Sequence, residues 1–188
     1  ALFSSIQEAL FSQKGMSFIF ELVGDQLHAM LDGYVISIAT FDHDSRTEYF
    51  QYHLEEGKRV YPDPRPYNKI RQILIDTHTQ ILVNENTENF VNDILGVEYI
   101  SSAKIDIPKS FLFAPLMVDE VVRGYISLKH NEKETVFDEE HIRLLNTLAK
   151  SISVTLQNDR LIKTERRKAD EQKALLDTMT DLSSKLDL

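Results

Sequence analysis

Residues 110–130 read SFLFAPLMVDEVVRGYISLKH, and residues 136–161 read VFDEEHIRLLNTLAKSISVTLQNDRL. The first stretch holds two apolar segments joined by the polar pair Asp119-Glu120, which predicts a β-hairpin. The second stretch has apolar residues at helical spacing, and Asp138 stands before it as an N-cap. The second half of the chain is therefore predicted to be a β-hairpin followed by a long helix.

Upstream of this hairpin, the sequence predicts a helix, a second hairpin and further short elements. These are a helix at about 16–31, strands at 34–41 and 47–56, helices at 67–78 and 87–95, and a short strand at 81–83. Residues 61–66, YPDPRP, are expected to form an extended loop, because each proline lacks the amide donor that a central strand needs. Together these elements predict an α+β fold with a central antiparallel sheet flanked by helices.

Composition excludes several classes of function. The chain has 188 residues, 42% of them hydrophobic and 27% charged, with a net charge of −9. An acidic body does not attract a phosphate backbone, so we expect no nucleic-acid partner. Because no apolar run approaches the ~20 residues of a membrane helix, we expect no membrane partner and a cytoplasmic location.

The sequence carries no recognisable catalytic or metal-binding motif. Absence of cysteine excludes disulfides, thiolate zinc sites, cysteine nucleophiles and thioether-linked chromophores. The six histidines show no metal-ligand spacing, and neither a glycine-rich phosphate loop nor a G-x-S-x-G motif is present. We therefore expect no enzymatic activity, and no cofactor can be named.

The last helix is expected to run well beyond the sheet. No Gly or Pro occurs after Asp138, and about fifty helical residues would reach roughly 75 Å. From Leu161 on, the apolar residues form a narrow stripe with a seven-residue repeat, and the repeat positions in the middle of this stretch are polar. This pattern favours a parallel homodimer. The seam residues that we expect are Leu161, Leu175, Met179, Leu182 and Leu186. The alternative is a solvated single helix.

The second half of the chain strongly resembles a GAF domain. The shared features are a serine at the start of an apolar strand, a proline in that strand, a glycine before the next strand, an aromatic–acidic helix cap and an Asn-x-x-Leu ending. Here these are Ser110, Pro115, Gly124, Phe137, Asp138, Glu139, Asn158 and Leu161. The first half is similar more loosely, through residues 55–86, and the resemblance covers about residues 10–162.

The resemblance implies a GAF-like, PAS-related fold and a sensory or regulatory role in a signalling protein. Such domains bind a small molecule over the sheet and relay the change through the exit helix to an output domain, here a kinase or a cyclase outside this sequence. We expect a terminal helix or linker at 1–15, the GAF domain at 16–160 and a helical linker at 161–188. A similarity between the two ends of the chain suggests that a second GAF domain begins near residue 174.

Two alternatives remain open at this point. One is a dimerisation and signal-relay spacer that binds no ligand. The other is a cyclic-nucleotide-binding GAF domain, for which Asp138-Glu139 matches the acidic pair of such relatives. However, Glu132 follows Asn131 where those relatives carry lysine, and the phenylalanine ahead of the acidic pair is missing.

Strand alternation indicates which side chains face a ligand. Ser37 lies on one face of the strand at 34–41, and Tyr125 and Ser127 lie on one face of the strand at 121–130. Arg59 and Tyr61 lead into the proline-rich loop, where a cation and an aromatic ring can meet an anionic ligand. These five residues are the predicted ligand-binding set.

Overall fold

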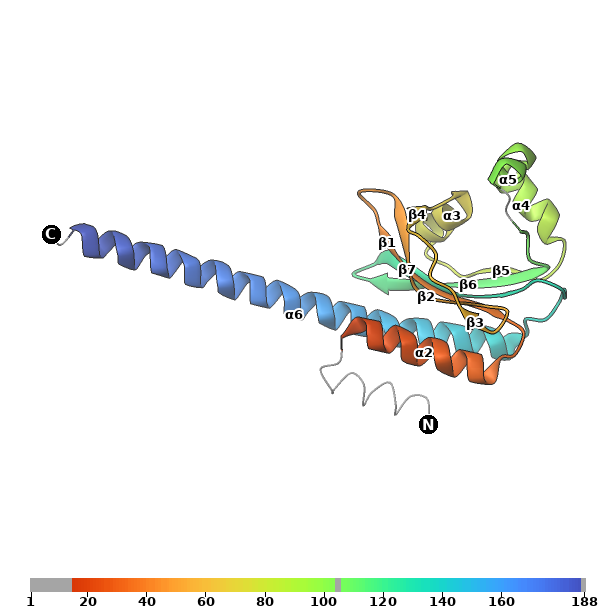
Figure 1. Ribbon diagram of the computed structural model, residues 1–188, viewed down its shortest axis with the longest axis horizontal. Coiled ribbons are helices and arrows are strands. Elements are labelled where there is room, and N and C mark those ends of the chain that lie inside the picture. Colours follow the sequence, from red (N-terminus) through yellow and green to blue (C-terminus); the bar gives the residue numbers. More distant parts are fainter. Residues whose placement is uncertain (1–14, 104–105, 187–188) are drawn as a thin grey trace.

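The computed structural model describes residues 15–103 and 106–186 (Figure 1). Five helices are described in these ranges: α2 (Met16–Met30), α3 (Lys69–Thr77), α4 (Thr87–Leu95), α5 (Val97–Ala103) and α6 (Glu139–Leu186). The strands are β1 (Val35–Asp42), β2 (Thr47–Glu55), β3 (Lys58–Arg59), β4 (Arg65–Pro66), β5 (Ile81–Val83), β6 (Ser110–Val118) and β7 (Val121–His130). The predicted helix or linker at 1–15 lies almost wholly outside the described residues, as does the N-terminal part of the end-to-end similarity.

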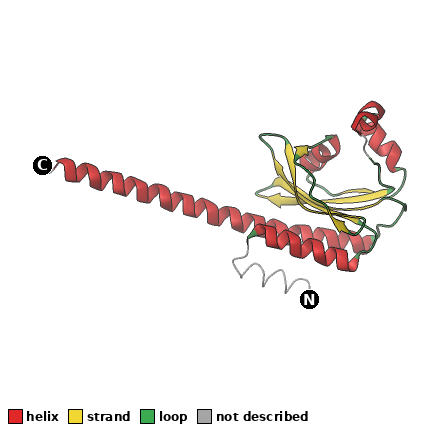
Figure 2. Cartoon of the chain, in the orientation of Figure 1, coloured by secondary structure: helices red, strands yellow, loops and turns green. Residues whose placement is uncertain are grey.

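The strands form one antiparallel sheet in the order β3-β2-β1-β7-β6-β5, and β4 pairs with β2 at its side. Helices α2 and α6 cover one face, which we call the α2/α6 face, and α3, α4 and α5 lie over the other, which we call the α3 face (Figures 1 and 2). The predicted α+β fold, its two hairpins and its long exit helix are confirmed.

Three short elements were not expected, and the first is β3, which pairs with the end of β2. Residues 65–66 pair with β2, although the whole proline-rich segment was predicted to be a loop. Pro66 is tolerated because β4 lies off the main path of the sheet, where a missing amide donor interrupts no central ladder. Helix α5 follows α4 after Gly96, whose φ of 84° is a conformation suited to glycine.

A separate hydrophobic core lies on each face of the sheet. On the α2/α6 face, Ile36, Ile38 and Leu128 of the strands pack against residues of α2 and α6 such as Val23 and Leu148. Gly24 lets α2 approach closely, because a Cβ there would lie 2.3 Å from the Tyr52 ring. Residues on the α3 face are more aromatic, and the cluster there is made mainly of Ala39, Phe41, Ile70, Leu74, Ile81, Val91, Ile100, Phe111, Phe113, Val122 and Tyr125.

A β-bulge in β2 decides which side chains reach the α3 face. Ala39 of β1 pairs with Phe50, but the preceding Ile38 pairs with Tyr52, so Gln51 is the extra residue. Because an extra residue reverses the alternation, Tyr52 packs on the α2/α6 face whereas Phe50 packs on the α3 face. The same reversal brings His53 to the α3 face, where it meets Ser37.

Helix α6 begins at a well-formed cap. The Asp138 carboxylate accepts hydrogen bonds from the amides of Glu140 and His141, at 2.9 and 3.1 Å. These bonds and the His141 ring hold the pKa of Asp138 below its usual value. One oxygen of this carboxylate, Oδ1, thus serves as the cap of α6.

Candidate ligand-binding site

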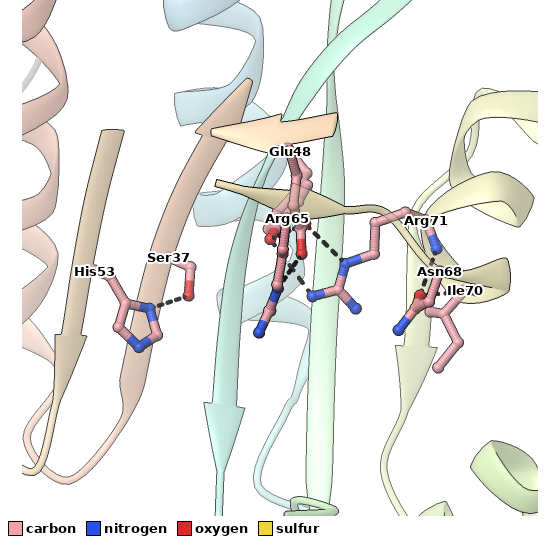
Figure 3. Close-up of polar contacts among 8 residues, drawn as sticks. Ser37, Glu48, His53, Arg65, Asn68, Ile70 and Arg71 are labelled. Atoms are coloured by element: carbon pink, nitrogen blue, oxygen red, sulfur yellow. Dashed lines mark hydrogen bonds and ion pairs between the residues drawn. The ribbon is translucent and has the colours of Figure 1, made fainter. Parts of the chain in front are cut away.

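A buried polar cluster lies on the α3 face around Glu48 of β2 (Figure 3). The two oxygens of this carboxylate, which is only 2% exposed, accept hydrogen bonds from Arg65 Nε at 2.7 Å and Arg71 Nε at 3.2 Å. Tyr125 of β7 donates its hydroxyl to Glu48 at 2.9 Å. The cluster therefore joins strands β2, β4 and β7 to helix α3.

Arg71 is the most enclosed cation of this cluster. Its guanidinium lies over the rings of Phe113 and Tyr125, with distances of 4.9 and 5.2 Å to the ring centroids. The preceding Asn68 caps α3 by accepting from the amides of Ile70 and Arg71, which fixes where the helix begins. Helix α3 thus positions the guanidinium of Arg71 over the sheet.

Electrostatics favour the ionised form of Glu48 despite its burial. Burial alone would raise the pKa of the Glu48 carboxyl, but the charges and hydrogen bonds of Arg71 and Arg65 outweigh it and lower that pKa. Burial raises the pKa of Tyr125, so its hydroxyl stays protonated and donates to Glu48. The centre of the cluster is a satisfied ion-pair network.

A second polar group runs beside this network in a row across three strands. Ser37 of β1 pairs in register with His53 of β2 on one side and with Ser127 of β7 on the other. The hydroxyl of Ser37 and Nδ1 of His53 are 2.8 Å apart (Figure 3). The Ser127 hydroxyl is fully buried and has no hydrogen-bond partner among the described residues. This row is therefore incomplete at Ser127.

Lys129 lies two residues beyond Ser127 on β7 and on the same face of the sheet. Burial lowers the pKa of its amine to about 7, and the charges of Arg71 and Arg65 contribute to that shift. Burial, with the charge of Lys129, also lowers the pKa of His53. At neutral pH, His53 is therefore neutral, and Lys129 is partly deprotonated.

The structure brings together three of the five predicted residues. Ser37, Tyr125 and Ser127 share the α3 face, as strand alternation predicted. Arg59 does not join them. Its guanidinium forms an ion pair with Glu21 of α2 and lies 3.7 Å from the centroid of the Tyr52 ring.

Arg59 and Tyr61 therefore lie apart from the other three residues, and their role in ligand contact stays a prediction. Arg59 pairs in register with Leu54, and both lie beyond the bulge, so the side chain of Arg59 turns to the α2/α6 face. Tyr61 is 80% exposed, and the nearest charge over its ring is Arg59 itself, at 5.2 Å. Neither contacts the side chains of the polar row, although Arg59 Nη1 donates a hydrogen bond to the backbone carbonyl of His53 at 3.0 Å.

Sequence reasoning missed the residues that organise the site. Glu48 and His53 lie on opposite sides of the bulge, so simple alternation places them on different faces. Arg71 stands beside Ile70 and three residues before Leu74, both of which are buried. That position on an apolar helix face was the available signal for a buried cation.

Two surface hollows lie elsewhere, along α6. One, of about 710 Å³, is bounded by residues of β1, β7 and α6 such as Phe41, Arg123 and Arg160. Another, of about 480 Å³, lies between Gln80, Met117 and α6. Neither includes a predicted ligand residue. We take the buried polar row as the candidate site, because an unsatisfied hydroxyl and a desolvated amine are stronger signs of a ligand than an open surface hollow.

The histidines of the described chain do not assemble a metal site. No group of three or more His, Asp or Glu side chains within residues 15–103 and 106–186 can hold a metal ion. His141 pairs with Asp138, and His53 pairs with Ser37.

Comparison with protein families then identifies the fold. The family model described as "GAF domain" matches residues 19–157, which is most of the chain. The chain belongs to the GAF domain family. This confirms the resemblance seen in the sequence, although no curated protein matches the chain.

Solved structures of GAF domains share the fold at low sequence identity. The GAF domain from Acinetobacter phosphoenolpyruvate-protein phosphotransferase is 15% identical, with a TM-score of 0.65 over 86% of this chain and 93% of that one. Residues 122 to 287 of a methyl-accepting chemotaxis protein are 15% identical, with a TM-score of 0.68 over 87% and 99%. The phycocyanobilin-bound GAF domain from a cyanobacterial phytochrome is 16% identical, with a TM-score of 0.66 over 85% and 94%.

These structural likenesses show the fold, and the family to which the chain belongs is typical of signalling proteins. GAF domains act as regulatory or sensory modules, some of them within enzymes. None of the helices in the described part of the chain combines the length and the apolar character that a bilayer crossing requires.

Proposed function

We propose that this GAF domain is the sensory module of a cytoplasmic signalling protein, binding a small molecule on the α3 face and relaying the change through α6. The observation that carries the proposal is the polar row on that face, with a buried Ser127 hydroxyl that lacks a partner. Buried hydroxyls are nearly always hydrogen-bonded, and a bound molecule would supply the missing bond.

The contacts between the α3 face and α6 support a relay. After α3 the chain passes through Gln80, whose side chain accepts a hydrogen bond from Asn146 of α6. The side chain of Asn84, just after β5, makes two hydrogen bonds with the backbone of Phe137. Its Oδ1 accepts from the Phe137 N–H at 3.1 Å, and its Nδ2 donates to the Phe137 carbonyl at 2.7 Å. A displacement of α3 would therefore pull on α6 near its beginning.

The output end of the relay is proposed to be a parallel homodimer along α6. In the single chain, the seam residues Leu161, Leu175, Met179 and Leu182 are 55–66% exposed; the side chain of Leu186 is outside the description. Such a row of bare apolar side chains at heptad spacing fits a second copy of the same helix. The polar middle of the seam would weaken the pairing there and permit a shift between two registers.

The proposed function is tested by a ligand screen on the purified chain. Native mass spectrometry detects a molecule that co-purifies, and a thermal-shift panel detects added ligands. A ligand at a hundred times its Kd should stabilise the fold by about 2.7 kcal/mol. If no compound of any class shifts the melting temperature, the chain acts as the ligand-free spacer instead.

Light scattering tests the dimer separately. The double variant Leu175→Asp/Leu182→Asp should be monomeric while its sheet domain stays folded by circular dichroism. A wild-type chain that is monomeric at tens of micromolar would contradict the dimer.

A further inference from the structure

The charges on the α3 face do not balance. Three cationic side chains, Arg65, Arg71 and Lys129, influence one another there, and Glu48 is the buried carboxylate among them. The second carboxylate, Glu55, has a side chain that is 48% exposed and lies 3.7 Å from His53. Both oxygens of Glu48 are taken by arginines, so the local excess charge is positive whenever Lys129 is protonated, with three cations against two carboxylates.

Lys129 carries that excess. Among the residues that the structure describes, no carboxylate forms an ion pair with its amine, whereas Arg65 and Arg71 are both paired with Glu48. The nearest aromatic surface is the ring of Phe113, whose centroid lies 5.9 Å from Lys129 Nζ. A partly buried amine that feels Glu48 and Glu55 only at a distance, and forms no ion pair with either, can pair with an anion from outside the chain.

The hydroxyl of Ser127 adds an independent sign of a missing partner. It is fully buried and makes no hydrogen bond within the described chain. Ser127 lies opposite Ser37 on β1 and opposite Phe113 on β6, and Lys129 is the next residue of β7 on this face. An oxyanion at this point could accept from the hydroxyl and the amine together.

We propose that the ligand of this site is a small organic anion whose carboxylate or phosphate group is held by Lys129 and Ser127. This inference rests on the proposed function and names the chemical class of its ligand. The Phe113 ring lies opposite Ser127 and 5.9 Å from Lys129 Nζ, but it is only 2% exposed and already packs against Arg71, so the two polar groups are the contacts that this inference assigns.

Such binding would be coupled to a proton. The unliganded amine has a pKa of about 7 because of burial and of the charges of Arg71 and Arg65, which Glu48 and Glu55 oppose. An anion favours the charged form and raises that pKa. At pH 8, where the free amine is mostly neutral and His53 is already neutral, binding should take up a proton.

The experiment is a thermal-shift screen with matched charge classes. Benzoate, short aliphatic carboxylates, inorganic phosphate and a sugar phosphate are compared with benzamide and with an organic cation, on wild type, Lys129→Met and Lys109→Met. Lys109 is an exposed lysine and controls for the lost charge. We expect at least one anion to stabilise wild type and Lys109→Met, and Lys129→Met to bind it about tenfold more weakly or worse.

The outcomes separate the two proposals. Stabilisation by a neutral or cationic compound, with none by anions, overturns the anion inference and leaves the sensory function standing. No stabilisation by any class overturns both. Carboxylates and phosphates are distinguished by which of them shifts the melting temperature.

Calorimetry on wild type keeps the inference testable if Lys129→Met does not fold. Titration of the anion at pH 8, in two buffers of different ionisation enthalpy, should show net proton uptake. The Lys129→Arg variant should bind with no such uptake, because arginine stays charged. Binding to wild type without proton uptake would place the anion away from Lys129.

Discussion

The two faces of the sheet use alternate side chains of the same strands, and they differ in what lies at their centres. On the α2/α6 face the central positions are aliphatic, among them Ile36, Ile38 and Leu128, and two helices close over them. On the α3 face, the neighbouring positions hold Ser37 and Ser127, with Glu48 and Arg71 nearby. The first arrangement stabilises the fold by burying apolar surface. The second buries less apolar surface at its centre and is less stabilising there, but it holds polar groups that could contact a ligand.

The largest effect is expected from removing Glu48, the buried carboxylate of the α3 face. In Glu48→Ala, Arg71 loses its counter-charge while only 7% of its side chain is exposed. Leaving a buried charge unpaired costs about 3–5 kcal/mol of unfolding free energy. Urea denaturation at pH 7 measures the loss, and Glu48→Gln, which keeps the shape, should lose less than Glu48→Ala.

The same pair has a defined pH dependence. The folded pKa of Glu48 is lowered, so its stabilisation is present above the unfolded pKa of about 4.3 and is lost as the pH falls through the folded value. Glu48→Gln should therefore lose less stability than wild type between pH 5 and strong acid. Parallel stability curves for the two proteins over that range would contradict the ion-pair assignment.

A cavity made in the core of the α2/α6 face should lower the free energy of unfolding. Leu148 of α6 is fully buried against the sheet, and Leu148→Ala should lower the free energy of unfolding by about 2–5 kcal/mol. Met30→Ala, at a side chain that is 57% exposed, should change it by less than about 0.5 kcal/mol. Equal effects of the two truncations would mean that α6 does not seal this face.

A smaller effect is expected where the two faces are connected. Asn84→Ala removes both hydrogen bonds to the Phe137 backbone and should cost about 1–3 kcal/mol. Hydrogen exchange should accelerate around residues 135–140 while α2 stays protected. The control is Asn89→Ala, at an exposed position of α4, and it should leave that exchange pattern unchanged.

The smallest change in stability is expected at the incomplete row. Ser127→Ala removes a hydroxyl that has no partner, so unfolding free energy should stay within about 1 kcal/mol or rise. Its matched neighbour, Ser37→Ala, takes the partner from His53 and should be the more destabilising of the two. If Ser127→Ala proves clearly worse than Ser37→Ala, the hydroxyl makes a structural bond within the chain.

Much of this fold could be predicted from local patterns. The hairpin around Asp119-Glu120 and the capped start of α6 depend on residues adjacent in sequence, and both appear where expected. Alternation also placed Ser37 and Ser127 on one face, because β1 and β7 pair between these residues without a bulge.

The remainder depends on contacts that sequence spacing does not encode. One extra residue, Gln51, reverses the faces of β2, so Glu48 and His53 share a face, and Arg59 reaches the other. Arg71 comes to the sheet only because α3 folds back over it, and its partners lie 23 and 54 residues away. No local pattern records such pairings.

The continuity of α6 also sets an angular constraint. Since the helix runs unbroken from Glu139 to Leu186, every residue inserted beyond the sheet advances its far end by about 1.5 Å and turns it by about 100°. Inserting seven residues nearly restores the phase, because about 700° is two turns less about 20°, whereas inserting two residues, which turn the helix by about 200°, points the far end almost to the opposite side. Whatever is attached there is therefore oriented by the number of residues in the helix as well as by the motion that reaches it.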